Sequence, residues 1–107
     1  LFDELERNTK WSFADYNPDS QRIFRVAEKD PISSYATAGL YYWREWNTYM
    51  QSLQLMMDAD DRTNGEFYLC PVYNYTMKLK DSRITGIMID QMHGVGIPED
   101  LDTWLNL

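Results

Sequence analysis

The sequence predicts an α/β domain in which helices cover a mixed β-sheet. Residues 10–16 and 22–28 alternate polar and apolar side chains with the period of β-strands. Over residues 44–58 the apolar side chains change to the spacing of an amphipathic helix. The predicted element order is β-β-β-α-α-β-(β)-α, and its strands need helices or a partner sheet over their apolar faces.

The first two strands are expected to form an antiparallel hairpin. The segment between them, residues 17–20 (NPDS), is dense in turn-forming residues. Phe24 and Val26 are expected to share one face of the second strand. Pro31 ends that strand, because a proline pushes the preceding residue toward extended geometry.

The middle of the chain is predicted to contain a buried strand followed by a helix. Residues 36–43 (ATAGLYYW) form a nearly continuous apolar run, which favours a buried strand. Gly39 within it indicates a bulge or a close approach by another backbone or a ligand. The apolar stripe of the helix predicts core packing and comprises Trp46, Tyr49, Met50, Leu53, Met56 and Met57.

The last third of the chain is predicted to alternate between helix and strand. A second helix is expected from about residue 68 to 80, with Pro71 in its first turn. A strand over 83–90 and a glycine-rich loop over 92–97 follow. Pro98 begins the last helix, whose apolar stripe consists of Leu101, Trp104 and Leu105.

Length and composition narrow the class of protein. The chain has 107 residues, 44% of them hydrophobic and 25% charged, so residues 1–107 are expected to form a single globular domain. The net charge of −7 and the lack of a basic run predict that neither nucleic acid nor an anionic membrane is a partner. No apolar run approaches the ~20 residues of a membrane span.

The single cysteine and single histidine exclude a disulfide framework and a Cys-rich or His-clustered metal site. A reduced, cytoplasmic setting is the expectation. The chain begins at Leu1 without an initiator Met or a signal-peptide pattern. We therefore expect it to start inside a longer reading frame.

Generic catalytic motifs are absent from the sequence, including the P-loop, GxGxxG, GxSxG and HExxH. Cys70 could act as a nucleophile with His93 as its base, but a buried structural cysteine is the favoured interpretation. Asp58, Asp60 and Asp61 superficially resemble a calcium loop. They lack its glycine and its distal glutamate, so a solvated helix end is predicted.

Two polar groups of residues suit a phosphorylated or hydroxyl-bearing ligand. Glu28 and Lys29 close a strand, where a carboxylate can bind a sugar hydroxyl and an ammonium can bind a phosphate. The alternative is a surface ion pair worth about 1 kcal/mol or less. Glu66 stands in a turn before a helix and could reach a hydroxyl. Its alternative role is to complement the helix dipole.

Four segments occur in the order and at the spacing of a known family. They are VAEKDPIS (26–33), ATAGLYYW (36–43), NGEFYLCPVYN (64–74) and HGVGIPEDLDTWL (93–105). Together they resemble the C-terminal half of the sugar-phosphate nucleotidyltransferases. These enzymes make NDP-sugars from an NTP and a sugar 1-phosphate, on a Rossmann-like nucleotide-diphospho-sugar transferase fold. The resemblance covers roughly residues 10–106.

The resemblance implies a set of substrate-binding residues. Glu28 and Lys29 match the pair that holds the sugar hydroxyls and the sugar phosphate. Gly39 and Tyr41 match the strand whose backbone and ring line the sugar site, and Glu66 matches an acid near the sugar. No catalytic residue and no metal ligand of the family is carried over to this chain.

The departures from the family pattern are equally informative. The glycine-rich nucleotide-binding loop, with its catalytic Arg and Lys, lies in the family's N-terminal half and is absent here. In many members an Asp two residues before a Gly-Thr dipeptide binds Mg²⁺, and Gly94 stands at that position. Mg²⁺ is thus expected for the full enzyme but not bound by this chain alone. Ile97 replaces the usual Thr, which could cap the last helix.

The resemblance implies that this chain is the sugar-binding half of an enzyme of NDP-sugar synthesis. It implies a role in polysaccharide biosynthesis, and we expect this half to be inactive alone. Whether this chain is an enzyme is left open. Its expected partners are a sugar phosphate or NDP-sugar and the missing N-terminal half. An alternative is a non-catalytic fragment that forms a homo-oligomer through its uncovered apolar faces. A Cys70-based hydrolase is a third alternative.

Overall fold

The computed structural model describes residues 1–79 and 82–106. Within these residues it has an α/β fold with an antiparallel five-stranded sheet in the order β1-β4-β2-β3-β5, which confirms the predicted fold class. The strands are β1 (Phe2–Asp3), β2 (Ser12–Asn17), β3 (Arg22–Glu28), β4 (Tyr35–Ala36) and β5 (Ile84–Thr85). The helices are α1 (Trp46–Asp58), α2 (Val72–Thr76) and α3 (Pro98–Leu105).

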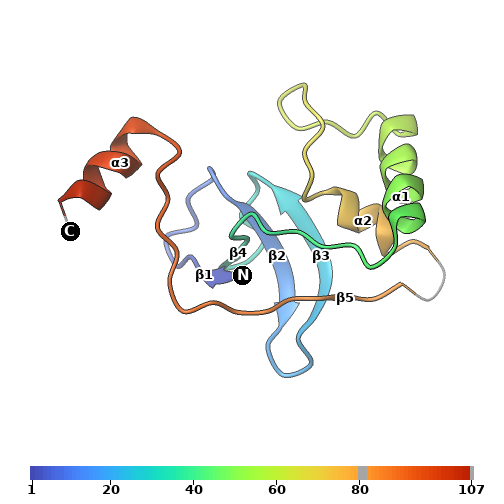
Figure 1. Cartoon of the computed structure of the whole chain (residues 1–107), viewed down its shortest axis with the longest axis horizontal. Helices are drawn as coiled ribbons and strands as arrows, with labels where there is room; N and C mark the ends of the chain where they lie inside the picture. The colour runs from blue at the N-terminus through green and yellow to red at the C-terminus, as the bar shows by residue number, and fades with distance from the viewer. Residues whose placement is uncertain (80–81, 107) are drawn as a thin grey trace.

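The hairpin of β2 and β3 is the largest part of the sheet and confirms the prediction (Figure 1). Its turn is held by Asn17, whose Oδ1 accepts hydrogen bonds from the main-chain N–H groups of Asp19 (2.9 Å) and Ser20 (3.2 Å). An asparagine that bonds its own backbone two residues on is a common turn device. The turn chemistry read from the sequence therefore explains the hairpin.

A β-bulge changes which residues of β3 face the core. The register shifts between Asp15 and Tyr16, so that Asp15 pairs with Arg25 while Tyr16 pairs with Ile23. Phe24 lies between these two partners and is 51% exposed, whereas Ile23 and Val26 are buried. The prediction that Phe24 and Val26 share a face is wrong, because the extra residue of a bulge reverses the alternation.

The strand predicted over 83–90 is reduced to β5 and an extended continuation. Its polar groups are shared between two neighbours: Gly86 N–H donates to Gln21 O at 2.8 Å, and Ile89 N–H donates to Leu1 O at 2.8 Å. In Figure 1 this segment runs across β3 and β2 toward the N-terminus. Residues 84–89 therefore link the two ends of the sheet.

The apolar run 36–43 is not the buried strand that its composition predicts. Strand β4 ends at Ala36, Thr37 N–H still donates to Ser12 O of β2 at 2.8 Å, and residues 38–43 lie outside any strand. Leu40 is 93% and Tyr42 is 77% exposed. The hydroxyl of Tyr73 replaces a neighbouring strand, since it accepts from Tyr42 N–H (2.7 Å) and donates to Tyr42 O (2.8 Å).

Helix α1 confirms the predicted helix, and part of its stripe packs in the core. Met56 is buried, and the partly buried Tyr49 and Leu53 pack beside it. Trp46 and Met50 are exposed at 71% and 42%. Fewer residues of α1 are therefore buried than its apolar stripe predicts.

Helix α2 is shorter than predicted and lies between α1 and β3. Pro71 immediately precedes its first residue, and the predicted end at Lys80 lies outside the described residues. Thr76 Oγ1 of α2 donates to Ser52 Oγ of α1 at 2.7 Å. The main apolar core lies between the sheet and α2, and its buried members are Ala14, Tyr16, Ile23, Val26, Cys70 and Tyr73.

Helix α3 begins at Pro98 as predicted, but within residues 98–105 no side chain is buried. It stands apart from α1 and α2 in Figure 1. Asp100 forms an ion pair with Lys10, and the Trp104 ring lies 4.5 Å from the His93 ring between centroids. None of the described helices has the length and apolar character that crossing a membrane requires.

Candidate functional site

Glu28 and Lys29 lie where the β2–β3 hairpin ends. Glu28 is the last residue of β3. Lys29 has a φ of 57°, in the left-handed region that few non-glycine residues adopt, and its N–H donates to Trp11 O at 3.0 Å. Its ammonium lies 5.3 Å from the centroid of the Tyr68 ring, a cation–π distance. The two predicted ligand-binding residues thus follow each other along the chain where the ladder ends, and the Lys29 side chain lies over Tyr68.

Glu28 is held from the opposite strand by Ser12. The two residues are direct partners in the β2–β3 ladder, and the Ser12 hydroxyl donates a hydrogen bond to Oε2 of Glu28. Ser12 is buried and Glu28 is partly exposed. Apart from its position in a predicted strand, nothing in the sequence marks Ser12 as part of the site.

Tyr41 reaches the same cluster from the segment between β4 and α1. Its hydroxyl shares a 2.7 Å hydrogen bond with Thr37 Oγ1, and its ring lies 5.9 Å from the Tyr73 ring between centroids. The phenol lies within hydrogen-bonding reach of Ser12 and Cys70, and burial is the main cause that raises its pKa. The structure therefore brings Tyr41 and Glu28 together through Ser12.

Cys70 completes this cluster and is not placed for nucleophilic chemistry. It is 2% exposed, and burial raises the pKa of its thiol to about 12. Its polar neighbours are Tyr41, Ser12 and Glu28, while His93 lies against Trp104 near α3. A buried thiol that stays protonated and has no histidine beside it is a poor nucleophile, so the hydrolase alternative loses its support.

Gly39 is placed near Tyr41 by the chain, but it does not make a close approach. It is exposed and has a φ of +87°, and a Cβ at this position would meet no atom within 4 Å. The expected bulge or close backbone approach is therefore wrong. Glycine suits the position because of its positive φ.

Glu66 lies in a separate, exposed turn. Thr63 and Glu66 exchange main-chain hydrogen bonds of 2.8 and 3.0 Å around Asn64 and Gly65, which both have positive φ, as a type I′ hairpin turn requires. The described contacts do not join Glu66 to Glu28. Tyr68, two residues further on, links this segment to the site through Lys29.

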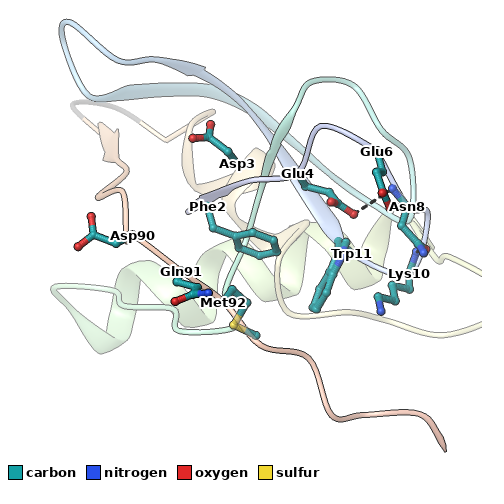
Figure 2. A pocket seen from close by; sticks show the side chains of 10 residues that line it. All are labelled: Phe2, Asp3, Glu4, Glu6, Asn8, Lys10, Trp11, Asp90, Gln91 and Met92. Atoms are coloured by element: carbon teal, nitrogen blue, oxygen red, sulfur yellow. Dashed lines mark hydrogen bonds between the residues drawn. The ribbon is translucent and has the colours of Figure 1, made fainter. Parts of the chain in front are cut away.

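A surface hollow lies elsewhere and has a different character (Figure 2). It has a volume of about 340 Å³ and is lined by Phe2, Trp11 and Met92 together with acidic side chains. The acids are Asp3, Glu4, Glu6 and Asp90. Four carboxylates against the single ammonium of Lys10 disfavour a phosphate in this hollow, so we take the cluster at Glu28 and Lys29 as the candidate site.

Position 94 cannot supply the family's Mg²⁺ ligand. A Cβ on Gly94 would lie 2.8 Å from the Trp11 ring and 3.2 Å from Oδ2 of Asp100, which leaves no room for an aspartate. Within residues 1–79 and 82–106, no three His, Cys, Asp or Glu side chains are grouped to hold a metal ion.

A solved structure shares this fold over almost the whole chain. The chain is similar to a nucleoside-diphosphate-sugar pyrophosphorylase. That protein comes from Vibrio cholerae RC9, and the match has a TM-score of 0.84 and 26% sequence identity over 99% of this chain. It covers 44% of the pyrophosphorylase, so the chain spans less than half of that protein's length.

Comparisons by sequence find no matching protein family and no matching curated protein. The structural similarity therefore supports a nucleotidyltransferase-like fold.

Proposed function

We propose that this chain is the sugar-binding half of a sugar-1-phosphate nucleotidyltransferase, an enzyme type that makes NDP-sugars, here for polysaccharide synthesis in the cytoplasm. The observation that carries the proposal is the cluster around Glu28, the last residue of β3, whose carboxylate is bonded to Ser12 with Tyr41 close by and which is followed directly by Lys29. The similarity to a nucleoside-diphosphate-sugar pyrophosphorylase supports it. In this assignment the sugar phosphate lies along the cluster formed by these side chains.

Each side chain suits one part of a sugar 1-phosphate. The Glu28 carboxylate accepts hydrogen bonds from sugar hydroxyls, and the Lys29 ammonium neutralises the phosphate as a point charge. The Tyr41 phenol stays neutral because burial raises its pKa, so it offers a hydrogen bond without adding charge. Gly39 contributes backbone groups, and Glu66 is assigned to the outer edge of the site.

Nucleotidyl transfer needs more than this half provides. Transfer to a sugar phosphate depends on positioning and on neutralising the triphosphate. A chain with a net charge of −7 and no phosphate-binding glycine loop does not supply that neutralisation. We therefore assign the nucleotide and its Mg²⁺ to the other half of the fold, and we expect this chain to be inactive alone.

A thermal-shift panel of sugar 1-phosphates, NTPs and inorganic phosphate tests this proposal. Sugar 1-phosphates should raise the melting temperature, and free NTPs should not. The Glu28→Gln variant should lose this rise in melting temperature. The Glu66→Gln variant should keep most of it, because Glu66 is exposed. Stabilisation by NTPs alone, or no shift with any sugar phosphate, would overturn the assignment.

Self-association is the second candidate function, and exposed apolar side chains favour it. Leu40, Tyr42 and Trp46 are more than two-thirds exposed around the start of α1, and Leu105 is 70% exposed on α3. Apolar side chains grouped on a surface mark interaction sites. A concentration-dependent mass by light scattering, with a flat ligand panel, would favour a non-catalytic oligomer over the sugar-binding proposal.

A further inference from the structure

Ser12 faces Glu28 across the β2–β3 ladder and fixes one of its carboxylate oxygens. Ser12 is 8% exposed, and its hydroxyl donates to Oε2 of Glu28. Hydrogen bonds to a charged acceptor are stronger than those between neutral groups. The carboxylate is therefore anchored from inside the sheet by a residue that does not itself reach the surface.

The other polar side chains around Ser12 are themselves uncharged. Tyr41 and Cys70 are both polar neighbours of Ser12. Both are buried groups that stay protonated at neutral pH, and Thr37 adds a hydroxyl 2.7 Å from that of Tyr41. The groups around Ser12 and Glu28 are thus neutral hydroxyls and a thiol, and the Ser12 hydroxyl donates to Glu28.

We propose that Ser12 is a positioning residue that sets the sugar selectivity of Glu28, an inference that rests on the proposed function. With Oε2 held by Ser12, Oε1 is the oxygen left to accept a sugar hydroxyl, and its direction is fixed. A fixed acceptor distinguishes an equatorial hydroxyl from an axial one. A carboxylate that can rotate accepts both, because it reorients to follow the hydroxyl, at the cost of ordering its side chain on binding.

The test compares α-D-glucose 1-phosphate with α-D-galactose 1-phosphate, which differ in the configuration of one hydroxyl. Calorimetric titration of the wild-type chain should give unequal affinities. Ser12→Ala should lower the affinity for the preferred sugar about tenfold and bring the ratio of the two affinities near one. Ser12→Thr, which keeps the hydroxyl, should preserve the ratio.

Two controls separate positioning from general destabilisation. Ser33→Ala removes another partly buried hydroxyl of the same region, one that donates to Ala14 O at 2.5 Å, and it should leave the affinity ratio unchanged. In urea unfolding, the effects of Ser12→Ala and Glu28→Gln should be non-additive, since the two side chains are bonded to each other. This second readout needs no ligand.

The possible failures are distinguishable. A wild-type chain that binds neither sugar phosphate would reject the proposed function. A wild-type chain that binds both equally, or a Ser12→Ala variant that keeps the wild-type ratio, would reject the role of Ser12 alone. Additive effects in urea unfolding would also overturn it, because they would mean that Ser12 does not anchor Glu28.

Discussion

The side chain of Asn74 in α2 is hydrogen-bonded at both ends to the main chain of Val26 in β3. Its Oδ1 accepts from Val26 N–H at 2.9 Å, and its Nδ2 donates to Val26 O at 2.7 Å. This pairing imitates a neighbouring strand. It ties α2 to β3 two residues before Glu28, and so links the helix layer to the end of the hairpin.

Asn74→Ala should leave both main-chain groups of Val26 without these partners. We expect the free energy of unfolding in urea to fall by about 1–3 kcal/mol. Asn47→Ala, an exposed asparagine within α1, is the matched control and should be neutral or slightly stabilising, because alanine favours helix. An equal loss of unfolding free energy in the two variants would show that the Asn74 side chain does not stabilise the fold through Val26.

Gly86 is needed because three side chains fill the space where a Cβ would lie. An added Cβ would be 2.7 Å from Leu1 Cδ1, 2.9 Å from Tyr16 Cε1 and 3.0 Å from Ile23 Cδ1. The Tyr16 ring is further held by its hydroxyl, which donates to Gly86 O at 3.1 Å. We expect Gly86→Ala to destabilise the fold by about 1–3 kcal/mol in thermal or urea unfolding.

Gly96→Ala provides the control for that substitution. A Cβ there would meet no atom within 4 Å, and its backbone does not have a positive φ. The variant should unfold like the wild type or be slightly more stable. A Gly96→Ala variant as destabilised as Gly86→Ala would show that glycine is required for a reason other than packing.

Stability should decline above pH 9 because of buried thiol and phenol groups. Burial raises the pKa of Cys70 from 9 to about 12, and that of Tyr73 from 10 to about 12. The unfolded chain therefore releases these protons at lower pH than the folded chain. The stabilising contribution is complete below pH 9 and is lost as the pH rises through about 12.

Urea unfolding across this pH range measures the loss. Cys70→Ala should move the start of the decline from near pH 9 to near pH 10, the ordinary pKa of the tyrosines. A thiol reagent should also fail to label native Cys70 at neutral pH. Rapid labelling of the folded protein, or the same pH profile in both proteins, would show that Cys70 is not buried in this way.

Ile97→Thr should strengthen the start of α3. Ile97 is the N-cap residue, and it has extended backbone geometry and no side-chain capping hydrogen bond. A threonine there can accept from a main-chain N–H of the first turn, a gain of about 1 kcal/mol. We expect a higher melting temperature and slower amide exchange within α3, while Ile97→Val should change neither. A neutral or lower melting temperature would show that α3 begins elsewhere.

The sequence allowed good prediction where local rules decide the structure. The β2–β3 hairpin follows from its turn residues, and α1 and α3 follow from helical spacing and from Pro98 at a first turn. The run 36–43 was misread because its composition does not show that a tyrosine hydroxyl 31 residues away replaces a neighbouring strand. Phe24 was misplaced because a bulge depends on the register of two strands.

The charged residues of the candidate site could be named from the sequence, but the residues that contact them could not. Glu28 and Lys29 stand out as a pair at a strand end, and the structure puts Tyr41 beside Glu28. Ser12 and Cys70 carry no such signal, because their role arises only when β2, β3 and the start of α2 come together. Glu66, in contrast, remains apart from that cluster.

An amide NMR titration of the chain with sugar 1-phosphates tests the sugar site most directly. We expect chemical-shift changes centred on residues 28–29 and 37–41. The affinity that the titration measures should fall about tenfold in Lys29→Asn, because asparagine lacks the charge but tolerates the positive φ. The affinity should be kept in Lys29→Arg. Shifts confined to the acidic hollow of residues 2–11 and 90–92, or no shifts, would contradict the assignment.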